Sequence, residues 1–457
     1  MKKIFGTDGI RCIVNQEPMT AETCLKIAKA TGYLLSYKRK DKQKDKQRVL
    51  LSKDTRLSGY LFEPLLTAGF ISMGMDVILI GPLPTPALPM LIKSLRADMG
   101  VMITASHNTY EYNGLKFFDS KGNKITKVLE KNIESIVFNQ AKYNKIFNLS
   151  YESGKALRLE DAQGRYSEYL KSTLDKKIKF KNLKVILDCA NGATYHIAPN
   201  LFWELGCDVK VINNKPNGKN INWNCGAVDV KQLSTRVIQE KADIGFAFDG
   251  DGDRIIAVDE KGTVIDGDNI IALFAENLLR LKKLNKKTVV TTVMSNLGLE
   301  KYLKEKLSVK LIRKDVGDIN VITEMQKKEY SLGGEQSGHI ILGNYMSTGD
   351  GILAALKIAE ILSSKKTKAS NIFKLYDKFP QIKINVPIKK KLNKKMLINF
   401  YKLSEKYKKK NPKLRFLLRE SGTEPLLRIL VEGNNIEEVA IIASKLELDI
   451  KRIINAK

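Results

Sequence analysis

The sequence predicts an α/β protein of several domains, and three observations lead to this fold class. Short apolar or β-branched segments, typical of buried strands, alternate with segments that have the apolar period of helices. The strand-like segments run directly into loops rich in Gly, Asn, Ser or Asp. The chain has 457 residues, 43% hydrophobic and 28% charged, enough for about three compact units. Such alternation indicates helices layered on mixed or mostly parallel sheets.

The predicted elements follow this alternation along the chain. Strands are expected where apolar or β-branched runs are bounded by turn residues, at 100–104, 184–189, 243–248 and 287–293. Amphipathic helices are expected at 195–205, 230–240 and 267–281. The segment after residue 374 predicts a small α+β domain, with a Lys-rich connection, strands at 414–418 and 426–432, and a helix from Ile436.

Domain boundaries are expected outside these elements. Cuts near residues 155, 258 and 373 each give a unit of ordinary domain size. We therefore predict four domains, at residues 1–155, 156–258, 259–373 and 374–457. Because α/β sheets bind ligands at the carboxyl ends of their strands, the loops that follow the predicted strands are the first candidates for a site.

The composition disfavours several classes of protein. Asp8 and Arg11 interrupt the N-terminal segment before any apolar core, so we expect no signal peptide. The longest apolar stretch, 77–92, contains four prolines and is too short to cross a bilayer. The five cysteines are scattered without a CxxC pair, which favours neither a disulfide framework nor a zinc site. A cytoplasmic protein with no membrane partner is therefore expected.

The net charge of +28 suggests nucleic-acid binding, because clustered Lys and Arg neutralise phosphates. The densest basic runs, 38–48 and 389–413, have the composition of solvated surface rather than of a recognition motif. Net charge governs association and solubility, not fold. We expect no specific nucleic-acid partner, and we predict a monomer or a weak homodimer.

Three carboxylates, Asp249, Asp251 and Asp253, follow the predicted strand 243–248 at alternate positions. Alternate side chains separated by glycines can converge on one point, and their hard oxygen atoms suit Mg²⁺. An EF-hand is excluded because its sixth position demands Gly and here holds Arg254. The other alternative is an acidic surface turn, but the strict alternation of Gly and Asp favours a metal site.

A hydroxyl, an imidazole and an ammonium group follow the predicted strand 100–104, on Ser106, His107 and Lys116. A Ser before a His is by itself more often a turn or a helix cap than a nucleophile. At the end of a strand, however, these three groups can supply a covalent carrier and two groups for proton transfer.

Two further loops have the residues of a ligand clamp. Glu335 and Ser337 lie on a glycine-flanked segment that ends at His339, and can hold sugar hydroxyls. The second loop lies between residues 419 and 428. Its amides, hydroxyls and two guanidinium groups can form a phosphate cradle from Arg419, Ser421, Gly422, Thr423 and Arg428. The alternative for this loop is an ordinary turn between two strands. The four loops together predict phosphoryl transfer on a sugar phosphate.

In order and spacing, these segments resemble the α-D-phosphohexomutase superfamily over essentially the whole chain. The resemblance is carried by residues 5–11, 53–56, 104–108, 249–254, 333–339 and 421–425. The segment 293–296 is similar to the glucosamine branch of the superfamily rather than to the mannose and glucose branches. The resemblance implies three related α/β domains and a TATA-binding-protein-like α+β domain around a central active-site cleft.

The resemblance also implies roles for the site residues. Ser106 would be a phosphoserine, and Mg²⁺ would bind its phosphate together with Asp249, Asp251 and Asp253. The other implied catalytic residues are His107, Lys116, Arg254 and His339. The implied substrate-binding residues are Arg11, Glu335, Ser337, Arg419, Ser421, Gly422, Thr423 and Arg428.

The implied function is that of an isomerase acting on small sugar phosphates. It would interconvert glucosamine 6-phosphate and glucosamine 1-phosphate for UDP-N-acetylglucosamine and peptidoglycan precursor synthesis, with a sugar bisphosphate as intermediate and activator. The alternatives are a phosphomannomutase or phosphoglucomutase of the same superfamily, a catalytically inactive sugar-phosphate sensor, or a basic nucleic-acid-binding protein that retains the fold. The sequence departs from the glucosamine branch at Asp315 and Ile319, where Lys and Arg are general, and from the superfamily at Cys12 and Thr109, where Gly and Pro are usual.

Overall fold

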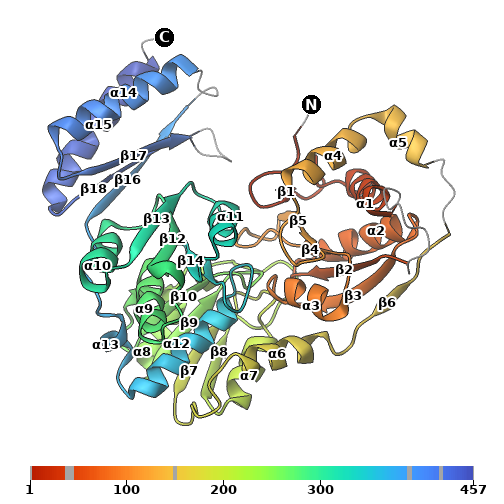
Figure 1. Ribbon diagram of the computed structural model, residues 1–457, viewed down its shortest axis with the longest axis horizontal. Helices are drawn as coiled ribbons and strands as arrows, with labels where there is room; N and C mark the ends of the chain where they lie inside the picture. The colour runs from red at the N-terminus through yellow and green to blue at the C-terminus, as the bar shows by residue number, and fades with distance from the viewer. Residues whose placement is uncertain (1–2, 37–45, 148–151, 389–393, 421–425, 456–457) are drawn as a thin grey trace. The chain divides into compact units, whose positions relative to one another are not determined.

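The computed structural model describes residues 3–36, 46–147, 152–388, 394–420 and 426–455. It consists of two compact units, Met1–Thr292 with Val309–Lys374, and Val293–Ser308 with Leu375–Lys457. The first unit contains three mixed sheets and the second contains one antiparallel sheet (Figure 1). These sheets and their helices confirm the predicted α/β fold class. None of the helices in the described ranges has the length and apolar character needed to span a bilayer.

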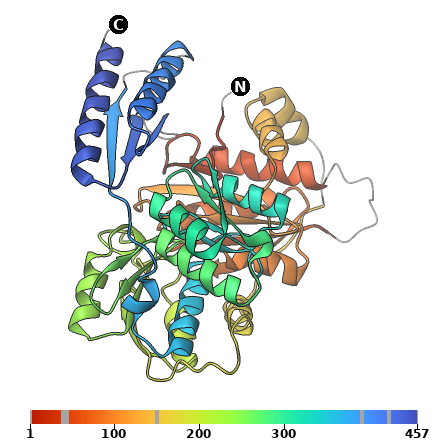
Figure 2. The same ribbon diagram turned by 60° about the vertical axis from the view of Figure 1, so that its left-hand side comes forward.

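The first sheet has six strands in the order β1-β5-β4-β2-β3-β6. Strand β5 is antiparallel to β1 and β4, and the other neighbours are parallel. Helices α1, α2 and α4 share one core with the sheet, and α3 lies on the opposite face from α1 (Figure 2). The elements are β1 (Ile10–Ile13), α1 (Ala21–Ser36), β2 (Arg48–Lys53), α2 (Gly59–Ile71), β3 (Asp76–Pro82), α3 (Ala87–Leu95), β4 (Met99–Ile103), β5 (Tyr112–Asp119), α4 (Lys127–Val137), α5 (Gln140–Phe147) and β6 (Ala156–Arg158).

The second sheet has the order β11-β10-β9-β7-β8, in which β8, β7 and β9 are parallel and the β9–β10 and β10–β11 pairs are antiparallel. All five residues of β9 are buried, which explains its continuous apolar sequence. The elements are α6 (Ala162–Ser172), β7 (Lys184–Asp188), α7 (Ile197–Glu204), β8 (Asp208–Ile212), a 3₁₀ turn (Gly226–Val228), α8 (Lys231–Gln239), β9 (Ile244–Phe248), β10 (Ile255–Asp259) and β11 (Val264–Ile265).

The third sheet has the order β13-β12-β14-β15, in which only the β14–β15 pair is antiparallel. The hairpin between β14 and β15 holds the predicted sugar-binding loop. The elements are α9 (Gly267–Arg280), a 3₁₀ turn (Asn285–Lys287), β12 (Thr288–Thr292), β13 (Lys310–Lys314), α11 (Asp318–Lys328), β14 (Leu332–Gly334), β15 (Ile340–Leu342), α12 (Gly351–Lys365) and α13 (Ala369–Phe373).

The second unit is an antiparallel sheet in the order β16-β18-β17, with α14 and α15 on one face (Figure 1). Its elements are α10 (Leu297–Leu307), β16 (Gln381–Pro387), α14 (Lys394–Lys410), β17 (Arg415–Glu420), β18 (Leu426–Glu432) and α15 (Ile436–Asn455). The buried Glu432 accepts hydrogen bonds from Leu297 N and from Arg415 Nη1, both at 2.8 Å. These bonds attach α10, which lies in the predicted third domain by sequence, to the C-terminal sheet.

The predicted strands and helices are confirmed within one or two residues at most ends. The Lys-rich segment before residue 414, expected to be a connection, instead contains a helix, α14 (Lys394–Lys410), although its lysines at 402, 406 and 408–410 are exposed, as expected for solvated surface. Phe400 of this helix is buried, and Met396, Leu403 and Tyr407 pack against the same core. These residues have helical spacing, but the many lysines between them hide the pattern. The three boundaries between the four predicted domains remain a prediction.

Candidate active site

Ser106 lies in the loop between β4 and β5, and only 1% of it is exposed. Its Oγ donates a hydrogen bond to Asp249 Oδ2 at 2.7 Å and lies 3.4 Å from His107 Nδ1. Its φ of 51° lies in the left-handed region, which is unfavourable by roughly 1–2 kcal/mol for a residue with a side chain. The loop therefore needs bonds from its surroundings to hold this conformation.

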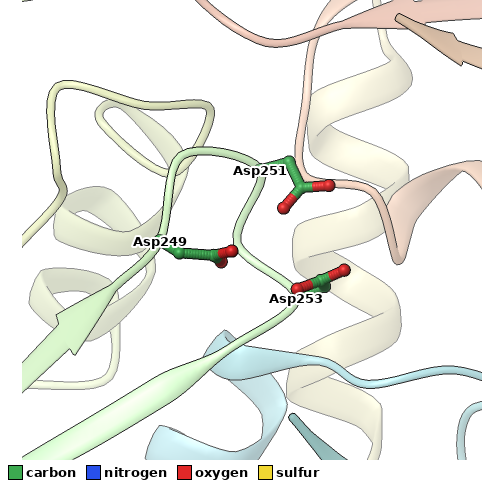
Figure 3. Close-up of side chains that lie close together, drawn as sticks. All are labelled: Asp249, Asp251 and Asp253. Carbon is green, nitrogen blue, oxygen red and sulfur yellow. The ribbon is translucent and has the colours of Figure 1, made fainter. Parts of the chain in front are cut away.

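The three aspartates project from the tight loop between β9 and β10 (Figure 3). One oxygen from each carboxylate lies within 4.8 Å of one from each of the others, so the group can hold a metal ion. Gly250 is required in this loop, because a Cβ there would lie 2.7 Å from Ser106 O. The close approach of the two loops brings the serine hydroxyl to the carboxylates.

The carboxylate oxygens have the donor chemistry that a divalent cation requires. Asp251 Oδ1 is buried and has no hydrogen-bond partner among the described residues. Its other oxygen accepts from Thr85 Oγ1 at 2.6 Å and from Lys116 Nζ at 2.8 Å. Among the described residues, Asp253 Oδ1 has no hydrogen-bond partner at short range and lies 3.5 Å from His339 Nδ1. Buried carboxylate oxygens of this kind fit Mg²⁺, which prefers oxygen ligands.

A ring of alternating charges connects the carboxylate trio to both neighbouring sheets. Lys116 Nζ lies 3.0 Å from Asp253 Oδ2 and 3.2 Å from Asp8 Oδ2. Lys124 pairs with both Asp8 and Asp318. The ring closes through His339, whose ring nitrogens lie 3.8 Å from Asp318 and 3.5 Å from Asp253.

This charge ring determines which groups carry protons. Burial alone would lower the pKa of Lys116, but Asp251, Asp253 and Asp8 raise it well above its usual range. Burial would likewise lower the pKa of His339, but Asp253 raises it. Lys116 therefore stays protonated at neutral pH, and His339 is biased toward its protonated form.

His107 has the opposite shift. Burial, followed by the positive charges of Arg254 and Arg11, lowers the pKa of His107 to about 3. Its imidazole is therefore neutral at physiological pH, and its Nδ1 lies 3.4 Å from Ser106 Oγ. Ser106 and His107 are neighbours in the sequence, but the charge of the imidazole depends on burial and on nearby charged groups, chiefly the two arginines.

Mg²⁺ is expected to stabilise the protein more at pH 8 than at pH 5. Burial, followed by the charges of Asp253 and Asp251, raises the pKa of Asp249 well above its usual range. The raised pKa means that the folded protein holds the Asp249 proton more tightly than the unfolded chain does. Without metal, protonated Asp249 therefore contributes its full stabilisation at pH values below the pKa of Asp249 in the unfolded chain. That contribution is lost as the pH rises through the pKa of Asp249 in the folded protein. Because the same proton competes with a cation, the Mg²⁺-dependent rise in melting temperature should grow with pH. Thermal unfolding with and without Mg²⁺ at both pH values measures it, and an equal or larger rise at pH 5 would contradict it.

The predicted sugar-binding loop contacts the aspartate loop, residues 249–254, through its backbone. Ile255 N donates to Gly338 O at 2.9 Å, and a bridge pairs Arg254 with His339. Gly338 has a φ of 93°, and a Cβ there would lie 2.1 Å from Ile255 O, so only glycine fits. Glu335 Oε1 accepts from Gly317 N at 3.1 Å, and Ser337 Oγ lies 3.5 Å from Glu335 Oε2.

Arg11 also lies in this site. Its guanidinium donates to Asn108 Oδ1 at 3.0 Å and pairs with Asp8 Oδ2 at 3.3 Å. The structure thus brings together the predicted residues of the first three domains: Arg11, Ser106, His107, Lys116, Asp249, Asp251, Asp253, Arg254, Glu335, Ser337 and His339.

The predicted phosphate clamp belongs to the second unit. Arg419 and Arg428 are cross-strand partners on β17 and β18. They line a cavity of about 220 Å³ together with Lys383 and Asn385 of β16. Two neighbouring guanidinium groups can donate charge-assisted hydrogen bonds to a phosphate, which fits the predicted clamp. The other predicted clamp residues, Ser421, Gly422 and Thr423, lie outside the described residues.

Several site residues were missed from the sequence. Asp8, Lys124 and Asp318 complete the charge ring, and Thr85 donates to Asp251. Asp8 lies in the segment 5–11, one of those on which the resemblance to the superfamily rests, so it could have been predicted as a site residue. Lys124 and Asp318 are 194 positions apart, and no local pattern connects them.

Four family models match the chain in order. They describe phosphoglucomutase/phosphomannomutase α/β/α domain I at residues 2–144, domain II at 164–262, domain III at 266–379 and the C-terminal domain at 382–448. Together with the serine and aspartate loops, these matches define an α-D-phosphohexomutase and confirm the resemblance.

Comparison with curated relatives identifies the branch of the superfamily to which the chain belongs. The chain is 44% identical to a phosphoglucosamine mutase of Desulfotalea psychrophila over 457 residues, with 100% of both chains covered. It is 47% identical to one of Thermodesulfovibrio yellowstonii over 448 residues, covering 97% of this chain and 98% of the relative. The chain belongs to the phosphoglucosamine mutase family, a family of isomerases within this superfamily.

Solved structures share the fold. A phosphoglucomutase/phosphomannomutase family protein from Burkholderia thailandensis has a TM-score of 0.81 and 22% identity, covering 99% of this chain and 97% of its own. Aspergillus fumigatus N-acetylphosphoglucosamine mutase in complex with GlcNAc-6P and magnesium has a TM-score of 0.63 and 17% identity, covering 99% and 96%. That superfamily member therefore binds a sugar phosphate and Mg²⁺.

Proposed function

We propose that this protein interconverts glucosamine 6-phosphate and glucosamine 1-phosphate. The observation that carries this proposal is the identity of 44–47% to curated phosphoglucosamine mutases over nearly the full length of both chains. The contact of 2.7 Å between Ser106 Oγ and Asp249 supports the chemistry, because it joins a hydroxyl carrier to a site for a divalent cation. We further propose that the enzyme acts in the cytoplasm, in the supply of UDP-N-acetylglucosamine and peptidoglycan precursors.

In the proposed cycle Ser106 carries the phosphoryl group as phosphoserine. The O1 hydroxyl of glucosamine 6-phosphate attacks the phosphorus, the bond to Ser106 Oγ breaks, and the O1 proton passes to a base. The bisphosphate then turns within the site. Ser106 Oγ takes the phosphoryl group from O6, O6 receives a proton, and glucosamine 1-phosphate leaves. An added sugar bisphosphate primes the enzyme by phosphorylating Ser106.

The shifted pKa values suggest how protons move in this cycle. Burial and two arginines lower the pKa of His107 to about 3, so it is neutral and a weak base that can hold a proton only transiently as the proton passes to or from the sugar oxygen. Lys116 and His339, whose pKa values are raised by carboxylates, hold protons that can be donated to a leaving oxygen. Arg254, partly buried beside Asp249 and Asp253, contributes a fixed positive charge near the transferred group.

Metal and substrate binding complete the proposal. Asp249, Asp251 and Asp253 would hold Mg²⁺, which when bound offsets the negative charge of the phosphoryl group. Arg11, Glu335 and Ser337 would bind the sugar, and the loop from Arg419 to Arg428 would hold the phosphate that is not reacting. We keep the four domains at the boundaries predicted from the sequence, and the monomer or weak homodimer, as proposals.

The decisive test compares three substrates. Turnover of glucosamine 6-phosphate, glucose 6-phosphate and mannose 6-phosphate is measured in parallel with Mg²⁺, each primed with a sugar bisphosphate. We expect kcat/KM to be highest for glucosamine 6-phosphate, by at least about 100-fold, because a site that hydrogen-bonds a specific polar group can discriminate by up to about 10⁴-fold. Preference for another hexose would keep the chemistry but reject the assignment, and would implicate Asp315 and Ile319. Salt-sensitive RNA binding without turnover would favour the nucleic-acid alternative.

A further inference from the structure

We propose that Asn222 is a positioning residue for phosphoryl transfer. Its side chain binds the Ser106 loop from the domain of the second sheet, and Arg56 binds the same loop from the domain of the first sheet. This inference rests on the proposed function, because it assigns a role in the transfer at Ser106. Neither side chain reaches the reacting hydroxyl. Both act through the backbone carbonyls of the loop that carries it.

Arg56 binds the loop from within the first domain. Only 1% of Arg56 is exposed, and its Nη2 donates to Ser106 O and Asn108 O, both at 2.8 Å. Its Nη1 donates to Tyr112 O at 3.0 Å and also to Thr109 O. One buried guanidinium thus binds three carbonyls of the segment between β4 and β5 and the carbonyl of the first residue of β5.

The Arg56 charge is balanced by a carboxylate that also orders the loop. Asp54 Oδ2 accepts from Arg56 Nε at 2.8 Å and from Thr104 Oγ1 at 2.6 Å. Thr104 Oγ1 in turn accepts from Ser106 N at 2.9 Å. The carbonyl and the amide of Ser106 are therefore both connected to the same buried ion pair, which fixes the peptide groups on either side of the serine.

Asn222 binds the same two carbonyls from a different domain. Its Nδ2 donates to Ser106 O and to Asn108 O, both at 2.8 Å, and only 4% of the residue is exposed. It lies between β8 and α8, 116 positions from Ser106 in sequence. Its own backbone is held by a bond of 2.9 Å from Asn222 N to Ala190 O. The amide therefore joins the serine loop to the domain that carries the aspartates.

Asn222 also lies against the metal loop. A Cβ placed on Gly250 would be 2.7 Å from Asn222 Nδ2 and 2.7 Å from Ser106 O. The amide thus stands between the loop that carries the phosphoryl group and the loop that carries the metal ligands. Ser106 is held in the unfavourable left-handed region, with a φ of 51°. Without the amide, Arg56 would still hold the loop to its own domain, but the distance from Ser106 Oγ to Asp249 would be less constrained.

The test compares Asn222→Ala with Asn224→Ala. Asn224 belongs to the same loop, also has a left-handed φ, 52° against 57° for Asn222, and is exposed. Both substitutions therefore carry a similar backbone penalty, but only Asn222→Ala removes the bonds to the serine loop. The full-length protein is assayed with glucosamine 6-phosphate and Mg²⁺, and phosphorylation of Ser106 by glucose 1,6-bisphosphate is followed by intact mass in a single turnover.

We expect Asn222→Ala to lower kcat and the rate of Ser106 phosphorylation by about 100-fold, the usual effect of misplacing reacting groups by about 1 Å. The KM for glucosamine 6-phosphate should change less than about threefold, because Asn222 acts on the serine loop and is not assigned to substrate binding. Asn224→Ala should leave both constants within about threefold. A purely structural role would lower the melting temperature and the amount of folded enzyme without this separation of kcat from KM.

Asn222→Asp is the second variant, because it keeps the shape of the side chain and removes its N–H donors. The same loss of kcat and phosphorylation rate is expected. Wild-type rates in either folded variant would overturn the positioning role, as would equal losses in Asn224→Ala. If the wild-type protein turned over no hexose phosphate, the proposed function would fail, while the phosphorylation assay would still decide whether Asn222 positions Ser106.

Discussion

Ser106→Ala is expected to lower turnover by about 10⁵-fold, the scale seen when a catalytic nucleophile is removed. Binding of glucosamine 6-phosphate should stay within about threefold, because Arg56 and Asn222 hold the loop through backbone carbonyls that alanine retains. The variant should also take up no phosphoryl group from a sugar bisphosphate. Turnover, calorimetric binding and intact mass measure the three effects.

The control for this variant is Ser94→Ala. Ser94 is an exposed serine of α3, so its loss removes a hydroxyl from the same domain without touching the site. Turnover of this control should be that of the wild-type protein. If Ser106→Ala kept most of its activity, the covalent cycle would be wrong, and a direct transfer between sugars would have to replace it.

Asp251→Asn is expected to weaken Mg²⁺ binding by at least about 100-fold, since loss of a ligand costs more than loss of its supporting partners. Turnover at saturating substrate should fall by about 10³-fold, because a bound metal supplies several kcal/mol of charge stabilisation. The loss of affinity is expected because the buried Oδ1 of Asp251, which accepts no hydrogen bond from the described residues, is available to bind a cation. Calorimetric titration with Mg²⁺ measures affinity independently of activity.

Asp259→Asn is the matched control for the metal site. Asp259 is buried at the far end of β10, and its Oδ1 accepts from Lys261 N at 3.0 Å and Thr263 N at 2.8 Å. The substitution removes one negative charge from the same hairpin and retains an oxygen for those bonds. Its Mg²⁺ affinity should match that of the wild-type protein. Equal loss of affinity in both variants would show that net charge, rather than coordination by Asp251, governs metal binding.

The chemistry-bearing loops could be predicted from the sequence because their signals are local. Asp249, Asp251 and Asp253 alternate with glycine directly after a fully apolar strand, and β9 is found there with all its residues buried. The small C-terminal domain was predicted from its strands and last helix. Its helix α14 was not, because lysines fill the solvent face and a few apolar residues, such as Phe400, make the contact with the core.

The residues that support the site could not be predicted in the same way. Asn222 and Lys124 are polar residues in loops, and nothing in their neighbourhood distinguishes them from ordinary turn or surface residues. Their importance arises because Asn222 meets the carbonyl of Ser106 and Lys124 meets Asp318, across sequence separations of 116 and 194 positions. Such contacts depend on how the domains pack, which a local pattern does not encode.

The sequence by itself determined the order of strands and helices and the groups available for chemistry, because apolar periodicity, glycine spacing and side-chain type are local properties. The tertiary structure decided which of these groups meet and which of them carry protons. Ser106 reaches Asp249 only when the two sheets bring their loops together. His107 becomes neutral and Lys116 stays charged because burial and neighbouring charges shift their pKa values in opposite directions. A pKa depends on the charges and solvent around a group, and those exist only once the chain has folded.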